Sequence, residues 1–303
     1  MRAGLLRTSL LPGLTLANPV LSASGCYNHG VEGARFGDVK RLGALVTKTV
    51  TPRPRAGNPP PRLWETSAGM LNSIGLENPG VERFLAEEMP RALELGPPVI
   101  LNVGGESLEE FEQVTERVQD CGAVALEVNL SCPNVQGGQL PFATSPAACE
   151  EVVGRVRRVS RLPFFVKLSP NTHLVADVAR AAASAGADGL TLINTLHGRG
   201  IDWRRRRPCL AEGSGGLSGP AIKPVALHFV ALVRAAVRLP ILGVGGIATA
   251  EDVCEFLVAG ASAVQVGTAH FLDPLCGVHI VEELEELLVA EGESIDNLSS
   301  LEQ

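Results

Sequence analysis

The sequence predicts an α/β fold, a (βα)8 TIM barrel formed by a single domain. Short runs rich in Val, Ile and Leu recur eight times along the 303 residues, and helical patterns separate them. Nearly continuous apolar strands that alternate with helices are typical of a parallel sheet covered by helices. Eight such units favour a closed barrel, for which 303 residues are a normal length. No G-x-G-x-x-G segment follows the first strand, which disfavours a Rossmann domain.

The strands and helices can be placed from hydrophobic periodicity. Strands are expected over residues 19–24, 44–49, 99–103, 124–129, 164–168, 189–194, 241–244 and 263–267. Apolar residues at helical spacing predict helices over residues 106–121, 174–185 and 221–237.

Two connections, residues 50–78 and 195–220, are longer than ordinary barrel loops. Long loops in a compact domain are usually functional or disordered. Both follow strand ends at the active face of a barrel, so we expect inserted loops that cover this face rather than linkers between domains. The second contains four consecutive arginines at 204–207, expected as a solvated loop, with an interface or anion site as the alternative.

Composition argues against several classes of protein. The net charge of −7 disfavours nucleic acid or an anionic membrane as the main partner. No apolar run is long enough to span a bilayer and the first residues lack a signal-peptide pattern, so we expect a cytoplasmic protein. The seven cysteines are scattered, without C-x2-C or C-x4-C spacing, so neither a metal centre nor a disulfide framework is expected.

Cys132 lies just beyond the fourth predicted strand, in the segment NLSCPN at 129–134. In a barrel, the carboxyl end of a strand is where chemistry takes place. A thiol in this position can act as a nucleophile or as a general base. An inert, buried thiol is the alternative, since free cysteine is among the most buried residue types.

Polar residues and glycines gather at the ends of the predicted strands, and a barrel brings strand ends to one cavity. They are Ser24, Lys48, Thr49, Asn102, Asn129, Lys167, Asn194, Thr195, Gly245, Gly246, Gly267 and Thr268. The glycines follow strands seven and eight, where barrels commonly hold a phosphate on backbone N–H groups. Glycine that only supplies a positive φ is the alternative.

Two lysines and several asparagines suggest the ligand at this cavity. Lys48 and Lys167 interrupt apolar strands, where an unpaired ammonium is costly. Glu127 is the acidic residue within such a run, and this scarcity favours ligand anions over internal ion pairs. The asparagines suit a flat ring with alternating carbonyl and N–H groups, although each alone can cap a turn. They are Asn72, Asn102, Asn129, Asn134 and Asn194.

Six segments, spread over nearly the whole chain, resemble the FMN-dependent dihydroorotate dehydrogenases of pyrimidine biosynthesis. They are NSIGLENPG (72–80), NLSCPN (129–134), VKLSP (166–170), INTL (193–196), GGLSGP (215–220) and GVGGI (243–247). The resemblance implies one FMN-binding barrel over residues 1–303 that oxidises dihydroorotate to orotate on the route to UMP. One departure is Cys26-Tyr27, where Thr and an aromatic residue are expected.

The resemblance also suggests a class within this family. Cys132 in place of serine, without a hydrophobic N-terminal extension, resembles the cytosolic cysteine enzymes, and VQGG at 135–138 resembles the NAD-linked ones. This implies a homodimer within a heterotetramer, with a partner subunit that carries FAD and a 2Fe-2S cluster. Alternatives are a fumarate-linked enzyme, a dihydropyrimidine dehydrogenase, a tRNA dihydrouridine synthase and a flavin-binding barrel without catalysis.

The resemblance assigns roles to the residues of the cavity. Cys132 is implied as the general base, and Lys167 as the cation that balances negative charge on the flavin. The implied FMN ligands are Ser24, Lys48, Thr49, Asn102, Asn129, Lys167, Ile193, Gly219, Gly245, Gly246, Gly267 and Thr268. The implied substrate ligands are Lys48, Asn72, Ser73, Ile74, Gly75, Leu76, Asn129, Asn194 and Thr195.

Overall fold

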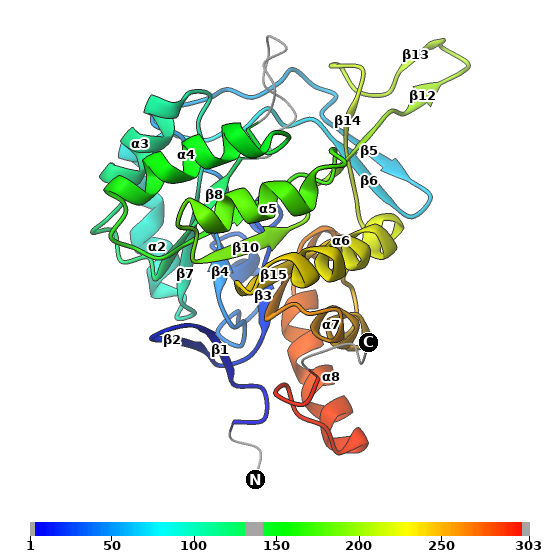
Figure 1. Ribbon diagram of the computed structural model, residues 1–303. Helices are drawn as coiled ribbons and strands as arrows, with labels where there is room; N and C mark the ends of the chain where they lie inside the picture. The colour runs from blue at the N-terminus through cyan, green and yellow to red at the C-terminus, as the bar shows by residue number, and fades with distance from the viewer. Residues whose placement is uncertain (1–3, 131–141, 299–303) are drawn as a thin grey trace.

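The computed structural model describes residues 4–130 and 142–298 of the chain. Its centre is a parallel sheet of eight strands surrounded by helices (Figure 1). In pairing order the strands are β3 (Val20–Ser22), β16 (Ala263–Val266), β15 (Ile241–Val244), β10 (Gly189–Leu192), β9 (Phe164–Lys167), β8 (Ala125–Asn129), β7 (Val99–Val103) and β4 (Leu45–Val46). A parallel bridge between Leu21 and Ala44 joins the first strand to the last and closes the barrel. The predicted fold class is confirmed.

All eight predicted strands are present. Those expected over residues 99–103 and 241–244 match at both ends. The other six are shorter, mostly at their carboxyl ends, where the chain leaves the ladder to form the mouth of the barrel. The strand ends therefore supply loop residues at the face where the sequence places the site.

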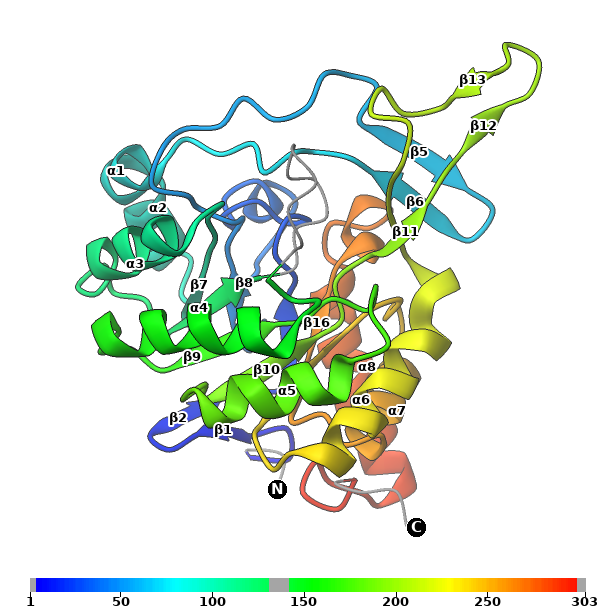
Figure 2. The same ribbon diagram turned by 45° about the horizontal axis from the view of Figure 1, so that its top comes forward.

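The helices lie outside the barrel and cover the outward faces of the strands (Figure 2). They are α1 (Val81–Arg83), α2 (Met89–Glu94), α3 (Leu108–Arg117), α4 (Pro146–Val159), α5 (Val175–Ser184), α6 (Lys223–Ala236), α7 (Ala250–Val258) and α8 (Cys276–Glu291). A π-helical turn, η2 (Phe84–Glu88), joins α1 to α2, and short 3-10 turns are η1 (Gly33–Arg35), η3 (Pro220–Ile222) and η4 (Thr268–Phe271). The predicted helices correspond to α3, α5 and α6. The Ser107 hydroxyl caps α3 by accepting from the Glu110 amide, which fits the predicted start of that helix.

The inside of the barrel is apolar at its lower end. Side chains alternate in and out along each strand, so residues such as Phe165 and Lys167 share the inner face. A hairpin of β1 (Thr8–Leu11) and β2 (Leu14–Leu16) lies at the end of the barrel away from the strands' carboxyl termini (Figure 1). Its leucines pack with Leu21, Ala44, Val46, Ile100, Ala125, Phe165, Leu242 and Ala263 in one buried cluster.

The two long connections fold together instead of forming irregular loops. They supply the antiparallel sheet β11 (Leu196–Gly198), β14 (Gly215–Ser218), β6 (Gly69–Asn72) and β5 (Leu63–Thr66), called here the lid sheet. A hairpin of β12 (Ile201–Asp202) and β13 (Arg207–Pro208) projects beyond it (Figures 1 and 2). The arginine run lies in this exposed hairpin, where Arg204 stacks on Trp203 and Arg205 pairs with Asp202.

Candidate active site

A cavity of about 290 Å³ lies between the carboxyl ends of the barrel strands and the lid sheet. Eleven of the residues singled out from the sequence line it. They are Ser24, Lys48, Thr49, Asn72, Ile74, Gly75, Leu76, Asn129, Lys167, Asn194 and Thr195. These residues come from segments as far apart as 24 and 195 in the chain, so the fold gathers them as the barrel topology predicts. We call this space the mouth cavity.

Lys167 stands at the floor of the mouth cavity and has an acidic protein partner. Its Nζ lies 3.5 Å from Oε1 of Glu127, and the two side chains are 7% and 0% exposed. The expectation that ligand anions alone would balance the lysines is therefore wrong for Lys167. The sequence shows Glu127 within an apolar run, but only the register between β8 and β9 shows that both side chains point inward.

Asn102 lies below the mouth cavity rather than in its wall. It is fully buried, and its Nδ2 donates to Oε1 of Glu127 at 2.6 Å. Its Oδ1 is buried without a hydrogen-bond partner among the described residues. Gln265 Oε1 is in the same condition. Two buried carbonyl oxygens without donors leave room for N–H groups of a bound molecule or for ordered water.

The glycines predicted to hold a phosphate form a cradle beside the mouth cavity. A Cβ on Gly246 would lie 2.9 Å from the carbonyl oxygen of Gly219, and one on Gly219 would lie 3.4 Å from Cγ2 of Thr268. Three chain segments therefore approach closely here, which only glycine allows. Gly245 and Gly246 also have positive φ, +135° and +77°. Gly267 completes the group, with Cys26 Sγ 3.3 Å from the position of its Cβ.

The segment at residues 72–76 runs along the cavity, with one exception. Ser73 is 1% exposed and its hydroxyl accepts from Asn58 Nδ2 at 2.9 Å, so its side chain serves the loop. Leu76 has φ +57°, an uncommon conformation for a side chain of this kind. Asn72 is tied to the lid sheet because its Nδ2 donates to the carbonyl oxygen of Gly216 at 3.2 Å.

Hydrogen bonds to neighbouring residues orient the remaining predicted polar side chains of the cavity. Asn129 Nδ2 donates to Thr49 Oγ1 at 3.2 Å, so the end of β8 and the segment that follows β4 orient each other's side chains. Asn194 Oδ1 accepts from the Thr195 amide at 2.8 Å. The side chain of Ile193 is buried, so any contact with a ligand would come from its backbone. The backbone amide of Ile193 already donates to the carbonyl oxygen of Val244.

Cys132 lies outside the described residues, as does Asn134. Among the described residues, the mouth cavity is lined by the thiol of Cys26, which the sequence marks only as a departure from the expected pattern. Burial raises the pKa of Cys26 to about 11, although Lys167 and Lys48 act in the opposite direction. A thiol with this pKa is protonated at neutral pH and is no candidate for a base.

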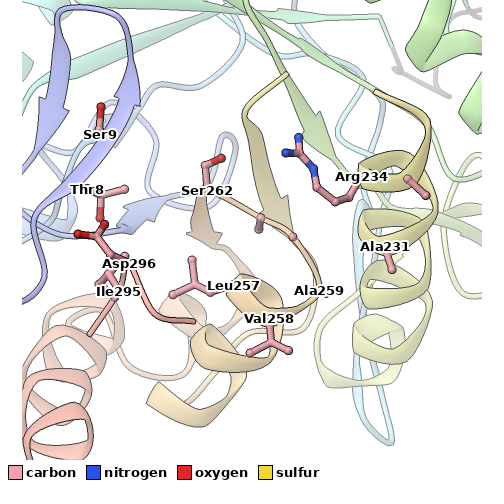
Figure 3. Close-up of a pocket in the computed structure, with 13 residues that line it drawn as sticks. Thr8, Ser9, Ala231, Arg234, Leu257, Val258, Ala259, Ser262, Ile295 and Asp296 are labelled. Atoms are coloured by element: carbon pink, nitrogen blue, oxygen red, sulfur yellow. The ribbon is translucent and has the colours of Figure 1, made fainter. Parts of the chain in front are cut away.

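A second cavity, of about 360 Å³, lies near the opposite end of the barrel (Figure 3). Its wall is formed mostly by small and apolar residues of α6, α7 and the loop after α7, with Arg234 and Asp296 as its charged members. The Arg234 guanidinium donates to the carbonyl oxygen of Leu239, close to its own helix. Neither lysine of the predicted site is near, so the mouth cavity is the candidate active site.

Residues 4–130 and 142–298 contain neither a metal-ligand cluster nor a membrane-spanning helix. There, no three His, Cys, Asp or Glu side chains are grouped as metal ligands. Within the same ranges, no helix has the length and apolar composition needed to cross a bilayer.

Comparison with known proteins identifies close relatives over almost the full chain. Residues 6–288 match the family model described as dihydroorotate dehydrogenase. A protein of Listeria monocytogenes named dihydroorotate dehydrogenase B (NAD(+)), catalytic subunit, is 47% identical over 97% of this chain and 96% of its own length. A Geobacillus kaustophilus protein of the same name is 51% identical over 92% of this chain and 89% of its own length.

Proposed function

Since the chain belongs to the dihydroorotate dehydrogenase family, we propose that it oxidises dihydroorotate to orotate for pyrimidine biosynthesis, with FMN bound at the mouth of the barrel. The observation that carries this proposal is the meeting of Lys48, Lys167 and three asparagines in one cavity beside a glycine cradle. A flavin cofactor follows from the family. That it is FMN, with one phosphate on the cradle, is our inference.

The chain's residues fit a flavin in two ways. At the cradle around Gly219, Gly246 and Thr268, a Cβ on either glycine would collide with neighbouring atoms, so the backbone there carries no side chains, as a phosphate site on N–H groups requires. The buried carbonyl oxygens of Asn102 and Gln265, which accept no hydrogen bond from any described residue, can accept from a bound molecule, and Lys167 offers a positive charge at the cavity floor. When bound, the flavin would supply the acceptor for the hydride of the substrate.

The substrate's carboxylate and ring amides match the other lining residues. We propose that Lys48 pairs with the carboxylate, while Asn72, Asn129, Asn194 and Thr195 bind the ring carbonyl and N–H groups; Ile74, Gly75 and Leu76 enclose the ring. Cys132 would remove the proton from the ring carbon next to the carbonyl as the hydride leaves the neighbouring carbon. The amide groups and the lysine ammonium groups that face the ligand would stabilise the negative charge that develops during the reaction.

Electrons would leave through a partner subunit that carries FAD and a 2Fe-2S cluster and reduces NAD. The names of the relatives, which include both NAD(+) and "catalytic subunit", support this choice over fumarate. We also propose a homodimer of the chain within a heterotetramer, one FMN-binding domain over residues 1–303, and a cytoplasmic location.

The proposal is tested by the visible spectrum of the purified protein. It should show flavin absorption that bleaches on anaerobic addition of dihydroorotate, and the released cofactor should be FMN by mass. A colourless protein that takes up no FMN would support a barrel without catalysis. Bleaching by dihydrouracil in preference to dihydroorotate would point to a dihydropyrimidine dehydrogenase. Reoxidation by fumarate, without a partner subunit, would contradict the NAD-linked assignment.

A further inference from the structure

A layer of polar side chains crosses the barrel just below the mouth cavity. Its five members come from five different strands and are between 0% and 5% exposed. They are Asn102 on β7, Glu127 on β8, Lys167 on β9, Thr191 on β10 and Gln265 on β16. The apolar cluster sealed by the β1–β2 hairpin lies beneath them, so this layer separates a dry interior from the cavity.

Glu127 is the centre of the layer and accepts from all four other members. Asn102 Nδ2 at 2.6 Å and Lys167 Nζ at 3.5 Å donate to its Oε1. Its Oε2 accepts from Thr191 Oγ1 at 2.9 Å and Gln265 Nε2 at 2.6 Å. Each carboxylate oxygen therefore has two donors, which fixes the plane of the carboxylate and the side to which Lys167 is drawn.

The side-chain amides of Asn102 and Gln265 both point their N–H groups toward Glu127. If the side-chain amide of Asn102 or Gln265 were rotated by half a turn, its buried carbonyl oxygen would face the Glu127 carboxylate, which also only accepts hydrogen bonds. Both amides instead present N–H groups to Glu127 and leave Oδ1 and Oε1 unpartnered among the described residues. The described residues of the layer therefore present only hydrogen-bond donors to the Glu127 carboxylate.

A buried carboxylate next to a buried ammonium changes what the cavity experiences. A buried charge is stable only when it is paired and hydrogen-bonded. Glu127 is paired with an ammonium and accepts hydrogen bonds. Of the two members of this ion pair, only Lys167 lines the cavity. The positive potential at the cavity floor is therefore that of an ammonium partly cancelled by a carboxylate 3.5 Å behind it.

We propose that Glu127 is a positioning residue that holds the Lys167 ammonium at the floor of the mouth cavity and attenuates its charge, and thereby sets the midpoint potential of the bound flavin. The inference rests on the proposed flavin binding and adds a residue that does not line the cavity. It gives the buried carboxylate a function beyond packing, because the charge reaching the cavity depends on the pair rather than on the lysine alone.

The test is the midpoint potential of the bound flavin in Glu127→Gln, which keeps the size of the side chain and removes its charge. An uncompensated ammonium favours the electron-rich flavin, so the potential should rise. A tenfold change in the ratio of affinities for the two redox states corresponds to about 30 mV for a two-electron couple. Glu127→Asp keeps the charge and disturbs packing more, and should stay closer to the unmodified protein.

The same substitution in a Lys167→Met background separates a charge effect from a general disturbance. Without the ammonium, Glu127 has no Lys167 to position or attenuate, so Glu127→Gln should then shift the potential less than it does when Lys167 is present. The double variant has no buried charge in the layer and should fold even where the single variant does not. Thr191→Val, which removes one hydrogen-bond donor to Glu127 but no charge, should shift the potential far less than Glu127→Gln.

Three outcomes would overturn the inference: a potential that is unchanged or lower in Glu127→Gln, an equal rise with and without Lys167, and an equal rise in Glu127→Asp. Flavin retention by the unmodified protein tests the proposed function by itself. A flavin-loaded protein whose potential ignores Glu127 would therefore refute the inference and leave the proposed function standing.

Discussion

Gly246 lies against the backbone of Gly219, so close that a Cβ on Gly246 would stand 2.9 Å from the Gly219 carbonyl oxygen and 2.8 Å from the Lys223 Cβ. The end of β15 and the loop after β14 thus meet without side chains between them. This contact joins a barrel strand to the lid sheet and forms one wall of the proposed phosphate cradle.

Gly246→Ala should weaken flavin binding. The new methyl group collides with backbone, and the φ of +77° strains an alanine, which together cost about 1–3 kcal/mol at the cradle. Flavin affinity, measured by fluorescence titration, should fall about ten- to a hundredfold. Gly154→Ala in α4 meets no atom within 4 Å and provides the control, since it should leave the affinity unchanged.

Lys48→Met should raise the KM for dihydroorotate and leave the flavin bound. A hydrogen bond to a charged group contributes about 1.5–3 kcal/mol, so the expected rise is about ten- to a hundredfold. Steady-state kinetics and the flavin spectrum measure the two effects separately. The exposed Lys40→Met variant is the control. An unchanged KM in Lys48→Met would remove the carboxylate contact from the proposal.

Cys132→Ser should slow bleaching of the flavin by dihydroorotate by about 10²–10⁴-fold, the usual contribution of a general base. Stopped-flow absorbance under anaerobic conditions measures this step directly. Flavin content should remain that of the unmodified protein. Cys254→Ser, on α7 and away from the mouth cavity, controls for the loss of a thiol. Bleaching at a near-normal rate in Cys132→Ser would exclude this base.

His270 should make folding stability depend on pH. Burial lowers its pKa to about 4, and its ring is fixed between the Val266 carbonyl oxygen at Nδ1 and the Gly277 amide at Nε2. The unfolded chain, with the usual pKa of 6.5, therefore binds a proton first as the pH falls. The contribution of His270 to the free energy of unfolding should drop by about 3 kcal/mol between pH 6.5 and 4 and then level off.

Denaturant unfolding at several pH values checks this dependence on His270. His270→Gln should lower stability at neutral pH and flatten the curve between pH 6.5 and 4. His29 is shifted in the same direction by burial, so part of the slope should remain. His228→Gln, on the exposed face of α6, should preserve the full slope. A slope that survives unchanged in His270→Gln would contradict the assignment.

The sequence predicts the barrel and most of the cavity wall because the strands are regular. Each apolar run ends in polar residues or glycines, and the topology of a barrel brings those ends to one side without further information. Lys48, Asn129 and Asn194 could thus be placed in one site before any contact was known. Cys132 and its role stay a prediction, since that residue lies outside the described ranges.

The contacts that the sequence does not reveal depend on register and on distant pairing. Whether Glu127 faces Lys167 or a helix depends on a single residue of register in β8, because neighbouring side chains point to opposite faces. The lid sheet pairs Asn72 with Gly216, which lie 144 residues apart, and its short, glycine-rich strands carry no periodic signal. The burial that keeps Cys26 protonated likewise arises only after folding.

The lid sheet also couples the proposed substrate and phosphate sites. Asn72 at the end of β6 is bonded to Gly216 of β14, and β14 runs through Ser218, whose hydroxyl accepts from Thr268, into Gly219. The residues proposed to bind the substrate and those proposed to bind the cofactor phosphate therefore belong to one hydrogen-bonded network in the lid sheet. Immobilising either end reduces the entropy that the second ligand must still remove, which is positive cooperativity. By thermodynamic reciprocity, a bound substrate analogue should raise the affinity for the cofactor by the same factor by which the bound cofactor raises the affinity for the analogue.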